Sequence, residues 1–418
     1  MADKFLILGK RPLFGEVEIS GSKNEAGAIL AASLLAKETE IDNLPLVSDI
    51  LNQIEILKSI GAKIEWLSEK KIKIKTDQID PEKIPIDLFE KMRISVLFLG
   101  PFLAKFKRIK IPPPGGDRIG LRPIITHLDA FEQLGVKIKK EGNFYYFEVP
   151  KKLEKKRVIL KEFSVTATET LISFLATIPQ KTRIDISAAE PHVQNLAKFL
   201  VKMGTKIEGI GTHTLIIQGK KKLESEFWKI GPDPIETGTF LIAFAITGGE
   251  GKIKNTNPED LIFFLEKMRE IGVLFETKKN EIVIKKSKKF LATKIQVLPH
   301  PGFPTDLQPQ TCVLLTQAEG KSIVHEPLYE NRFQHLHELR KMGADIEITD
   351  PHRALIFGKK ELFGTKVNSS DIRSGASLVL AGLIAKGETI VENISQIDRG
   401  YEKLDEKLKK LGAEIKRI

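Results

Sequence analysis

A proline- and glycine-rich stretch around one carboxylate is the best candidate for a catalytic loop in this sequence. It reads IPPPGGDRIGLRP from Ile111 to Pro123, with four prolines and three glycines around Asp117. Prolines stiffen the two stems, and a glycine pair lets the tip fold close to a ligand. The composition fits an active-site lid, although an ordinary surface connection can share it.

Several arginines stand where an anion is the simplest partner. Arg373 opens an apolar helical run in DIRSGAS, where the helix N-terminus and the guanidinium fork both favour phosphate or carboxylate. Pairing with neighbouring acids such as Asp371 or Asp398 is the alternative. Several such arginines together favour an anion site, and the set is Arg93, Arg122, Arg332, Arg373 and Arg399.

Two further polar positions precede apolar helical runs. Lys23 and Asn24 lie in SGSKNEAG, and Asp306 lies in PGFPTDLQPQ. An aspartate at such a point can cap the helix or serve as a general base in a closed cleft. The residues alone favour the cap.

Charge and composition narrow the function classes. The 418 residues carry a formal net charge of +11 but only 7% aromatic residues, and no nucleic-acid-binding signature is present. Binding of small phosphorylated substrates explains the excess of basic over acidic residues equally well. The single cysteine, Cys312, excludes a disulfide or a cysteine-based metal site. The sequence shows neither a signal peptide nor a membrane-spanning run, so we expect a cytoplasmic protein without membrane association.

The elements that must position these residues recur with a regular spacing. Six glycines each end an amphipathic helical stretch and precede an alternating, strand-like one. Their successive spacings are 74, 69, 68, 71 and 69 residues, and they are Gly61, Gly135, Gly204, Gly272, Gly343 and Gly412. This period predicts six repeated units.

A second, more apolar helix lies upstream of most of these glycines. The runs are AGAILAASLLA, MRISVLFLGPFLAKF, ETLISFLATI, ETGTFLIAFAI and GASLVLAGLIAKGE. A helix that is apolar nearly all round is buried, so each unit of about 70 residues has one buried helix, one exposed helix and short strands. The length suggests two domains with three units each, and KIGPDP at 229–234 marks the expected hinge.

Taken together, the motifs resemble those of the enolpyruvyl transferase family, in particular its UDP-N-acetylglucosamine branch. The matching segments run from Ile19 to Leu404 and are GSKN, MRIS, PPPGGDRIGLRP, SVTATET, EPHVQNLAKFL, GFPTDLQ, ENRFQH, DIRSGASLVLAG and IDRGYE. The resemblance implies an α/β fold of two inside-out α/β barrel domains. Residues 21–229, with the loop 111–123, form the first domain, residues 1–20 plus 230–418 form the second, and the cleft lies between them.

The resemblance also implies an activity. The enolpyruvyl group of phosphoenolpyruvate is transferred to the 3-hydroxyl of UDP-N-acetylglucosamine by addition and elimination, releasing phosphate. This is the first committed step of peptidoglycan synthesis and supports cell-wall growth, cell shape and division. It needs no metal and no cofactor, and we predict no nucleic acid and no obligate protein partner.

Residue roles follow from the same resemblance. Asp117 is the general acid, and Asp306 is the base for the attacking hydroxyl. Lys23, Arg122 and Arg399 hold phosphate and carboxylate. The remaining predicted substrate contacts are Asn24 for the sugar, Ser164, Val165, Thr166, Pro123 and His127 for uridine diphosphate, and Arg93, Arg332, Arg373, Asp233 and Leu328 elsewhere in the cleft.

Four positions depart from the family pattern. The family usually has a cysteine, alkylated by fosfomycin, where this chain has Asp117. An aspartate can still act as the acid if burial and a second carboxylate raise its pKa. We therefore predict an active, fosfomycin-insensitive enzyme, and Cys312 cannot substitute because it lies inside a helical run. Glu25, Ile125 and Pro234 depart on the uridine side.

Three other readings compete with this one. The sister enzyme 3-phosphoshikimate 1-carboxyvinyltransferase shares the fold and the donor, but its own glycine and arginine motifs are not found. A catalytically inactive regulatory paralogue has little reason to keep all of Lys23, Asp117, Arg122, Asp306, Arg373 and Arg399. Nucleic-acid binding through the net charge predicts steep salt dependence.

Overall fold

The structure, a computed structural model, describes residues 4–117 and 119–418. Residues 1–3 of the predicted second domain and residue 118 of the predicted loop lie outside the described residues. The chain divides into two units. Unit 1 comprises Met1–Ser20, Asp117–Leu121 and Pro232–Ile418, and unit 2 comprises Gly21–Gly116 and Arg122–Gly231. The chain therefore passes between the units at 20–21, 116–117, 121–122 and 231–232, and the tip of the loop belongs to unit 1.

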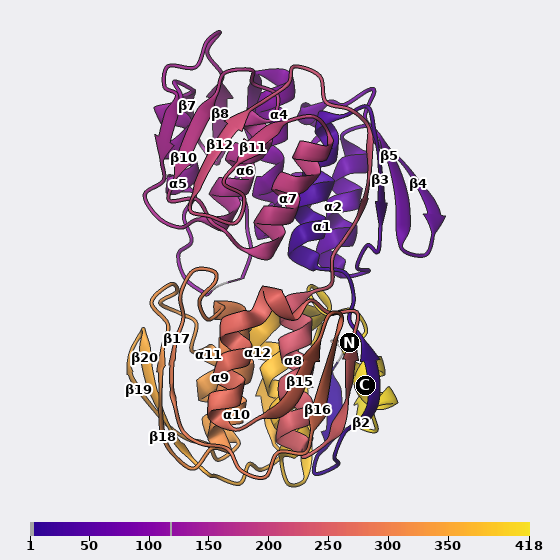
Figure 1. The fold of residues 1–418 in the computed structure, drawn as a ribbon, viewed down its shortest axis with the longest axis vertical. Helices are drawn as coiled ribbons and strands as arrows, with labels where there is room; N and C mark the ends of the chain where they lie inside the picture. Colours follow the sequence, from indigo (N-terminus) through magenta and orange to yellow (C-terminus); the bar gives the residue numbers. More distant parts are fainter. Residues whose placement is uncertain (1–3, 118) are drawn as a thin grey trace. The chain divides into compact units, whose positions relative to one another are not determined.

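Unit 2 has three sheets around its own helices (Figure 1). The sheet orders are β13-β3-β5-β4, β11-β12-β10-β9 and β6-β8-β7. The strands are β3 (Glu38–Asp42), β4 (Lys63–Ser68), β5 (Lys71–Lys75), β6 (Arg108–Ile111), β7 (Lys137–Glu141), β8 (Phe144–Glu148), β9 (Arg157–Ile159), β10 (Thr182–Asp185), β11 (Lys206–Glu208), β12 (Thr214–Gln218) and β13 (Glu226–Lys229). The helices are α1 (Lys23–Ala32), α2 (Ser48–Ser59), α3 (Ile86–Phe89), α4 (Leu99–Phe106), α5 (Ile125–Gln133), α6 (Val165–Leu175) and α7 (Pro191–Lys202), with short 3-10 turns η1 (Ser33–Leu35), η2 (Pro81–Lys83) and η3 (Arg93–Phe98).

Unit 1 has the sheet orders β21-β22-β1-β23, β15-β16-β14-β2 and β17-β18-β20-β19. Its strands are β1 (Phe5–Leu8), β2 (Phe14–Glu18), β14 (Glu250–Lys254), β15 (Leu274–Lys278), β16 (Glu281–Lys285), β17 (Lys294–Gln296), β18 (Gly320–His325), β19 (Asp345–Asp350), β20 (Arg353–Gly358), β21 (Lys366–Asn368), β22 (Glu388–Glu392) and β23 (Glu414–Arg417). Its helices are α8 (Pro234–Thr247), α9 (Ile262–Ile271), α10 (Gln308–Thr316), α11 (Gln334–Lys341), α12 (Ile372–Ile384), α13 (Ser395–Asp398) and α14 (Leu404–Lys410), with η4 (Pro258–Leu261) and η5 (Thr305–Leu307).

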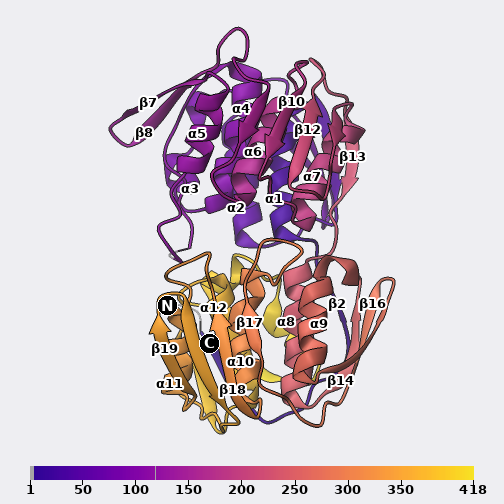
Figure 2. The same ribbon diagram turned by 60° about the vertical axis from the view of Figure 1, so that its left-hand side comes forward.

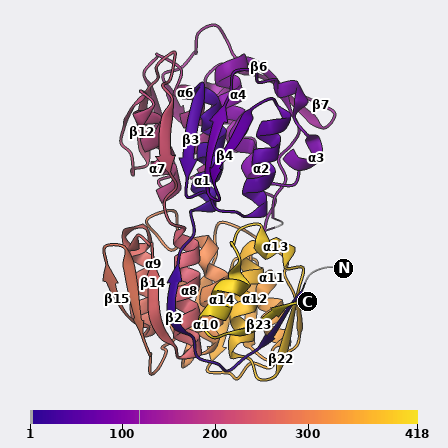
Figure 3. The same cartoon turned by 90° about the vertical axis from the view of Figure 1, so that its right-hand side faces the viewer.

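The apolar helices are internal, as their composition predicts. Every residue of α10 and of α12 is buried, and in α1 only Asn24 is not. Figure 1 shows α8, α10 and α12 inside unit 1 with strands on its outside, and Figure 3 shows β3 and β4 outside α1 in unit 2. Each unit has its own hydrophobic core around these helices.

One predicted helix is wrong in detail. The run MRISVLFLGPFLAKF is not a single helix, because η3 ends at Phe98 and α4 begins at Leu99. Pro101 lies in the first turn of α4, where a backbone N–H has no helical partner and its absence is tolerated. The α-helix therefore starts only two residues before the proline.

The six periodic glycines act as predicted. Each follows a helix (α2, α5, α7, α9, α11 or α14) and has a positive φ, between 86° and 110°. Each precedes a strand that starts two residues later. A residue with a Cβ is strained at such a φ, which explains the recurrence of glycine. Among residues 4–117 and 119–418, no helix is long and apolar enough to cross a membrane.

Candidate active site

In unit 2, a buried ion pair positions Lys23 at the start of α1. Ser22 caps this helix, its Oγ accepting from Glu25 N at 3.4 Å. Lys23 Nζ lies 2.8 Å from Asp49 Oδ2, in the first turn of α2, and the two side chains are 8% and 2% exposed. Asp49 thus holds an ammonium group beside a helix N-terminus, where anions are favoured. Asn24, the next residue, is partly exposed.

Arg93 anchors the return of the predicted loop. Its Nη1 donates to the carbonyl oxygen of Arg122 at 2.7 Å, and its Nη2 donates to that of Pro123 at 3.4 Å. Arg122 has a φ of 43°, a conformation that few residues with a side chain adopt. A Cβ on Gly116 would lie 2.7 Å from the Cβ of Arg93, so the outgoing stem also needs its glycine. Arg93 therefore supports the backbone from which the Arg122 side chain projects.

Four of the five predicted uridine residues lie together at the N-terminus of α6, and Pro123 instead contacts Arg93. Ser164 caps this helix, which begins at Val165. The Nε2 atom of His127, on α5, lies 3.0 Å from Thr166 Oγ1. Burial, aided by Arg93, lowers the pKa of His127 to about 3, so the ring is neutral at physiological pH. Within the described part of the chain, His127 Nδ1 is buried without a hydrogen-bond partner, which leaves one ring nitrogen for a ligand.

In unit 1, Asp306 bridges two buried arginines. Its Oδ1 lies 2.9 Å from Arg332 Nη2, and its Oδ2 lies 3.1 Å from Arg373 Nε and 3.0 Å from Arg373 Nη2. The prediction that Asp306 caps a helix is wrong, since the residue before η5 is Pro304 and no side chain caps this turn. Its carboxylate is instead drawn into the arginine cluster, because two buried guanidinium groups need a counter-ion.

The cluster keeps donors for a ligand. Arg373 Nη1 and Arg332 Nε are buried and have no hydrogen-bond partner among the described residues. Asp371 caps α12 by accepting from the N–H groups of Arg373 and Ser374, and its Oδ1 lies 3.6 Å from Arg332 Nη1. Burial acts to lower the pKa of Arg373, but Asp306, Tyr401 and Asp233 outweigh it and raise this pKa beyond its ordinary value. Two permanent cations with spare N–H groups suit an anionic substrate.

The loop carboxylate is an ion-pair partner in this structure. Asp117 Oδ1 accepts from Arg399 Nη1, which also donates to Gln396 Oε1 at 2.8 Å. The Asp117 and Arg399 side chains are 14% and 17% exposed. Two further hydrogen bonds hold the tip of the loop within unit 1. Leu121 N donates to Glu330 Oε1 at 2.8 Å, and Asn331 N donates to Ile119 O at 3.0 Å. To donate a proton, Asp117 has to leave this pair.

Other predicted residues have structural contacts that the sequence did not reveal. Asp233 caps α8, accepting from the N–H groups of Ile235 and Glu236, and Pro234 occupies the first helical position, where proline is well tolerated. Leu328 is 43% exposed, and its N–H donates to Glu326 Oε1 at 3.0 Å. Ile125 is exposed at the start of α5.

Glu25, a departure from the family pattern, is fully satisfied. Its Oε2 accepts from Asn195 Nδ2 at 2.7 Å, and its Oε1 accepts from Trp228 Nε1 at 2.8 Å and from Gly231 N at 3.2 Å. The side chain is buried and ties α1 to α7 and to the last residue of unit 2 before the crossing. Its role here is therefore structural support next to Lys23 and Asn24.

Three acidic partners were missed as functional residues, namely Asp49, Asp371 and Glu326. Asp371 carries a usable sequence signal, since it directly precedes a buried helix and aspartate is a favoured helix cap. Burial raises the pKa of Glu326, whose Oε2 accepts from Thr305 Oγ1 at 2.7 Å next to Asp306. Asp398 pairs with Arg417 rather than with its neighbour Arg399.

Cys312 is buried inside α10, as expected, and burial raises the pKa of its thiol. It is therefore unreactive at neutral pH. Among the residues that the structure describes, no three or more His, Cys, Asp or Glu side chains are grouped so as to hold a metal ion.

Comparison with known proteins adds independent information. Residues 7–408 match the protein family described as EPSP synthase (3-phosphoshikimate 1-carboxyvinyltransferase). The chain is 43% identical over 418 residues to UDP-N-acetylglucosamine 1-carboxyvinyltransferase 1 of Caldanaerobacter subterraneus, covering 100% of both chains. It is 41% identical over 418 residues to UDP-N-acetylglucosamine 1-carboxyvinyltransferase of Klebsiella pneumoniae, covering 100% of this chain and 99% of the relative.

Solved structures share the fold at lower identity. The enolpyruvyl transferase NikO from Streptomyces tendae matches with a TM-score of 0.90 and 22% identity, covering 100% of this chain and 99% of that chain. EPSP synthase from Acinetobacter baumannii matches with a TM-score of 0.76 and 17% identity, covering 100% of both chains. These matches confirm the enolpyruvyl transferase fold and its mixed α/β content.

Proposed function

Because the chain belongs to the EPSP synthase family of enolpyruvyl transferases, we propose that it transfers the enolpyruvyl group of phosphoenolpyruvate to the 3-hydroxyl of UDP-N-acetylglucosamine and releases phosphate. The observation that carries this choice of acceptor is identity of 43% and 41%, over 418 residues, to enzymes named for that reaction. The solved EPSP synthase is only 17% identical. The reaction is an early step of peptidoglycan synthesis, in the cytoplasm.

The residues of unit 2 supply anion and nucleotide binding. Lys23 and Arg122 hold phosphate and carboxylate, and Asn24 contacts the sugar. The capped N-terminus of α6 and the unpartnered Nδ1 of His127 support a nucleotide contact here. Arg93 acts through the loop backbone it anchors.

The residues of unit 1 supply the proton transfers. Asp306 takes the proton of the 3-hydroxyl as the oxygen attacks carbon 2 of phosphoenolpyruvate, and Asp117 protonates carbon 3. The adduct then loses a proton from carbon 3 and its phosphate leaves, which restores the double bond. Arg332 and Arg373 orient Asp306, and their permanent charges stabilise the negative charge of the departing phosphate. Arg399 holds Asp117 until substrate competes for its guanidinium.

The loop aspartate has a pharmacological consequence. A carboxylate offers no thiolate for fosfomycin to alkylate, so turnover continues at fosfomycin concentrations that inactivate cysteine-containing relatives. The only cysteine of the chain is buried in α10. We expect Asp117→Cys to become covalently labelled by fosfomycin, detected as a mass shift of the intact protein, while the parent chain stays unlabelled. Labelling of the parent chain contradicts this role of Asp117.

The finer description of the fold belongs to the same proposal. Six repeated units of about 70 residues form two inside-out α/β barrel domains. The six glycine-capped helices and the buried helices of each unit support it. The proposed domains are residues 21–229 and residues 1–20 plus 230–418.

The acceptor is tested by identifying the product. Purified protein with phosphoenolpyruvate and UDP-N-acetylglucosamine should yield an enolpyruvyl ether of the sugar nucleotide, identified by mass spectrometry. A parallel reaction with shikimate 3-phosphate tests for the activity of EPSP synthase, after which the matched family is named. Product from shikimate 3-phosphate alone reverses the assignment, and no product from either acceptor favours an inactive paralogue.

A further inference from the structure

One of the six sheets lacks a strand that the other five have. In those five, the strand after the buried helix pairs in parallel with a further strand, and the pairs are β3 with β13, β10 with β9, β14 with β2, β18 with β17 and β22 with β21. In the sixth sheet, β6-β8-β7, the strand β6 pairs only with β8 among the described residues. Figure 2 shows β7 and β8 at the margin of unit 2.

The exposed edge of β6 has free backbone groups. In an antiparallel ladder, the backbone groups of successive residues point alternately toward and away from the partner strand. Val149 N donates to Lys107 O at 2.8 Å, so the backbone of Lys107 points toward β8. The backbone groups of Ile109 and Ile111 therefore face β8, and those of Arg108 and Lys110 face outward. Within the described chain, these outward N–H and C=O groups form no hydrogen bond. Such an edge is a template for another strand.

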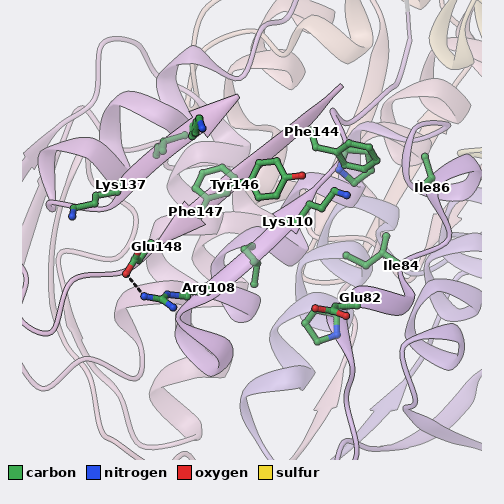
Figure 4. Close-up of a pocket in the computed structure, with 15 residues that line it drawn as sticks. Glu82, Ile84, Ile86, Arg108, Lys110, Lys137, Phe144, Tyr146, Phe147 and Glu148 are labelled. Carbon is green, nitrogen blue, oxygen red and sulfur yellow. Dashed lines mark hydrogen bonds and ion pairs between the residues drawn. The ribbon is translucent and has the colours of Figure 1, made fainter. Parts of the chain in front are cut away.

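The segment in the place of the missing strand cannot complete the sheet. It includes η2 and residues 84–86, and Pro81 and Pro85 have no N–H to donate. A pocket of about 970 Å³ lies between this segment and the sheet. Figure 4 shows Ile84 and Ile86 along one side of the pocket and Lys110 on the neighbouring strand. The groove therefore has one apolar wall and one wall of unpaired backbone.

Charge defines what the groove accepts. On the outer face of the sheet, the register aligns Arg108 with Glu148 and Lys137, and Lys110 with Tyr146 and Lys139. Arg108 is already paired with Glu148 at 2.6 Å, whereas Lys110 lies over the Phe144 ring and has no carboxylate partner among the described residues. A strand added along β6 places a side chain next to Lys110, where an acidic residue is favoured. Its alternate side chains face inward beside Ile109 and Ile111, which are buried. The complementary pattern is thus acidic and apolar residues in alternation.

We propose that β6 accepts an extended, acidic segment of a partner protein, which adds to this sheet as its parallel fourth strand. The chain's own fourth strands are three to five residues long, so a short segment suffices. Cations and prolines at an edge also prevent self-association, because a second copy of this strand is equally basic. The cations repel a basic strand but attract an acidic one.

Fluorescence anisotropy of a labelled peptide tests this docking. The probe is a peptide of alternating glutamate and valine, titrated with the full-length protein. The control peptide has the same charge but carries proline in place of valine, so it can attract cations but cannot pair as a strand. We expect the probe to bind and the control to bind at least about tenfold more weakly. Equal binding of the two peptides, or no binding of the probe, overturns the proposal.

Two substitutions at one position separate backbone pairing from charge. Lys110→Ala removes the cation only, whereas Lys110→Pro also removes the outward N–H without disturbing the ladder to β8. We expect Lys110→Pro to bind the probe about tenfold more weakly than Lys110→Ala. If Lys110→Pro and Lys110→Ala bind the probe equally well, the backbone edge of β6 does not take part in binding. Lys110→Glu provides a second variant if the proline impairs folding, and its affinity for the probe must also fall. Turnover of all folded variants should match the parent protein, since the groove holds none of the proposed catalytic residues.

Discussion

Replacing Asp306 by asparagine tests the most specific feature of the proposed chemistry. The carboxylate receives hydrogen bonds from Arg332 and Arg373, whose side chains are 1% and 5% exposed. The amide keeps one acceptor oxygen but neither the negative charge nor a basic site. Loss of a general base lowers turnover by about 10²- to 10⁴-fold, equivalent to about 3–5 kcal/mol in the activation free energy.

The same substitution has a separate cost in stability. One charge-assisted hydrogen bond is lost, worth about 1.5–3 kcal/mol, because only one oxygen remains for two guanidinium groups. For a domain of this size we expect the Tm to fall by about 3–12 °C. Turnover is measured by phosphate release at a temperature where circular dichroism shows the variant to be folded.

Asp371→Asn is the matched control. It perturbs the same arginine, Arg332, but Asp371 has no proposed proton-transfer role. We expect its turnover to fall less than that of Asp306→Asn. Turnover of folded Asp306→Asn within about threefold of the parent refutes Asp306 as the base.

Further predictions concern the buried groups of unit 2. The pKa of His127 is lowered from about 6.5 in the unfolded chain to about 3 in the folded one. The unfolded state therefore binds more protons between these values, and stability falls as the pH drops through this window. When the pH is lowered from about 7 to about 5, the unfolding free energy of His127→Gln should fall by about 2 kcal/mol less than that of the parent protein. Denaturant titrations at the two pH values measure both losses, and equal losses contradict the lowered pKa of His127. Glu25→Ala leaves three hydrogen-bond donors unsatisfied and should lower the unfolding free energy by about 3 kcal/mol, and Glu25→Gln should lower it by less. The fluorescence emission of Trp228 should change in both variants. An unchanged midpoint of denaturation shows that the three hydrogen bonds do not stabilise unit 2.

Local patterns predicted the elements well, because they depend on neighbours in sequence. The spacing of Gly61 and its five counterparts predicted helix ends with a positive φ, which all six have. Apolar runs predicted the buried helices, except where Pro101 shifted the start of α4. The resemblance predicted the enolpyruvyl transferase fold.

Partners that are distant in sequence could not be predicted from local patterns. Asp306 meets Arg332 and Arg373 across 26 and 67 residues, and Asp117 meets Arg399 across 282. Local sequence therefore favoured a helix cap for Asp306. It also gave no sign that Arg93 holds the loop backbone.

The central claim is the identity of the acceptor, and phosphate release from phosphoenolpyruvate tests it most directly. Initial rates are compared with UDP-N-acetylglucosamine and with shikimate 3-phosphate as the acceptor, each with and without fosfomycin. We expect release with the sugar nucleotide only, at a rate that fosfomycin does not change. Release with shikimate 3-phosphate, or none with UDP-N-acetylglucosamine from folded protein, contradicts it.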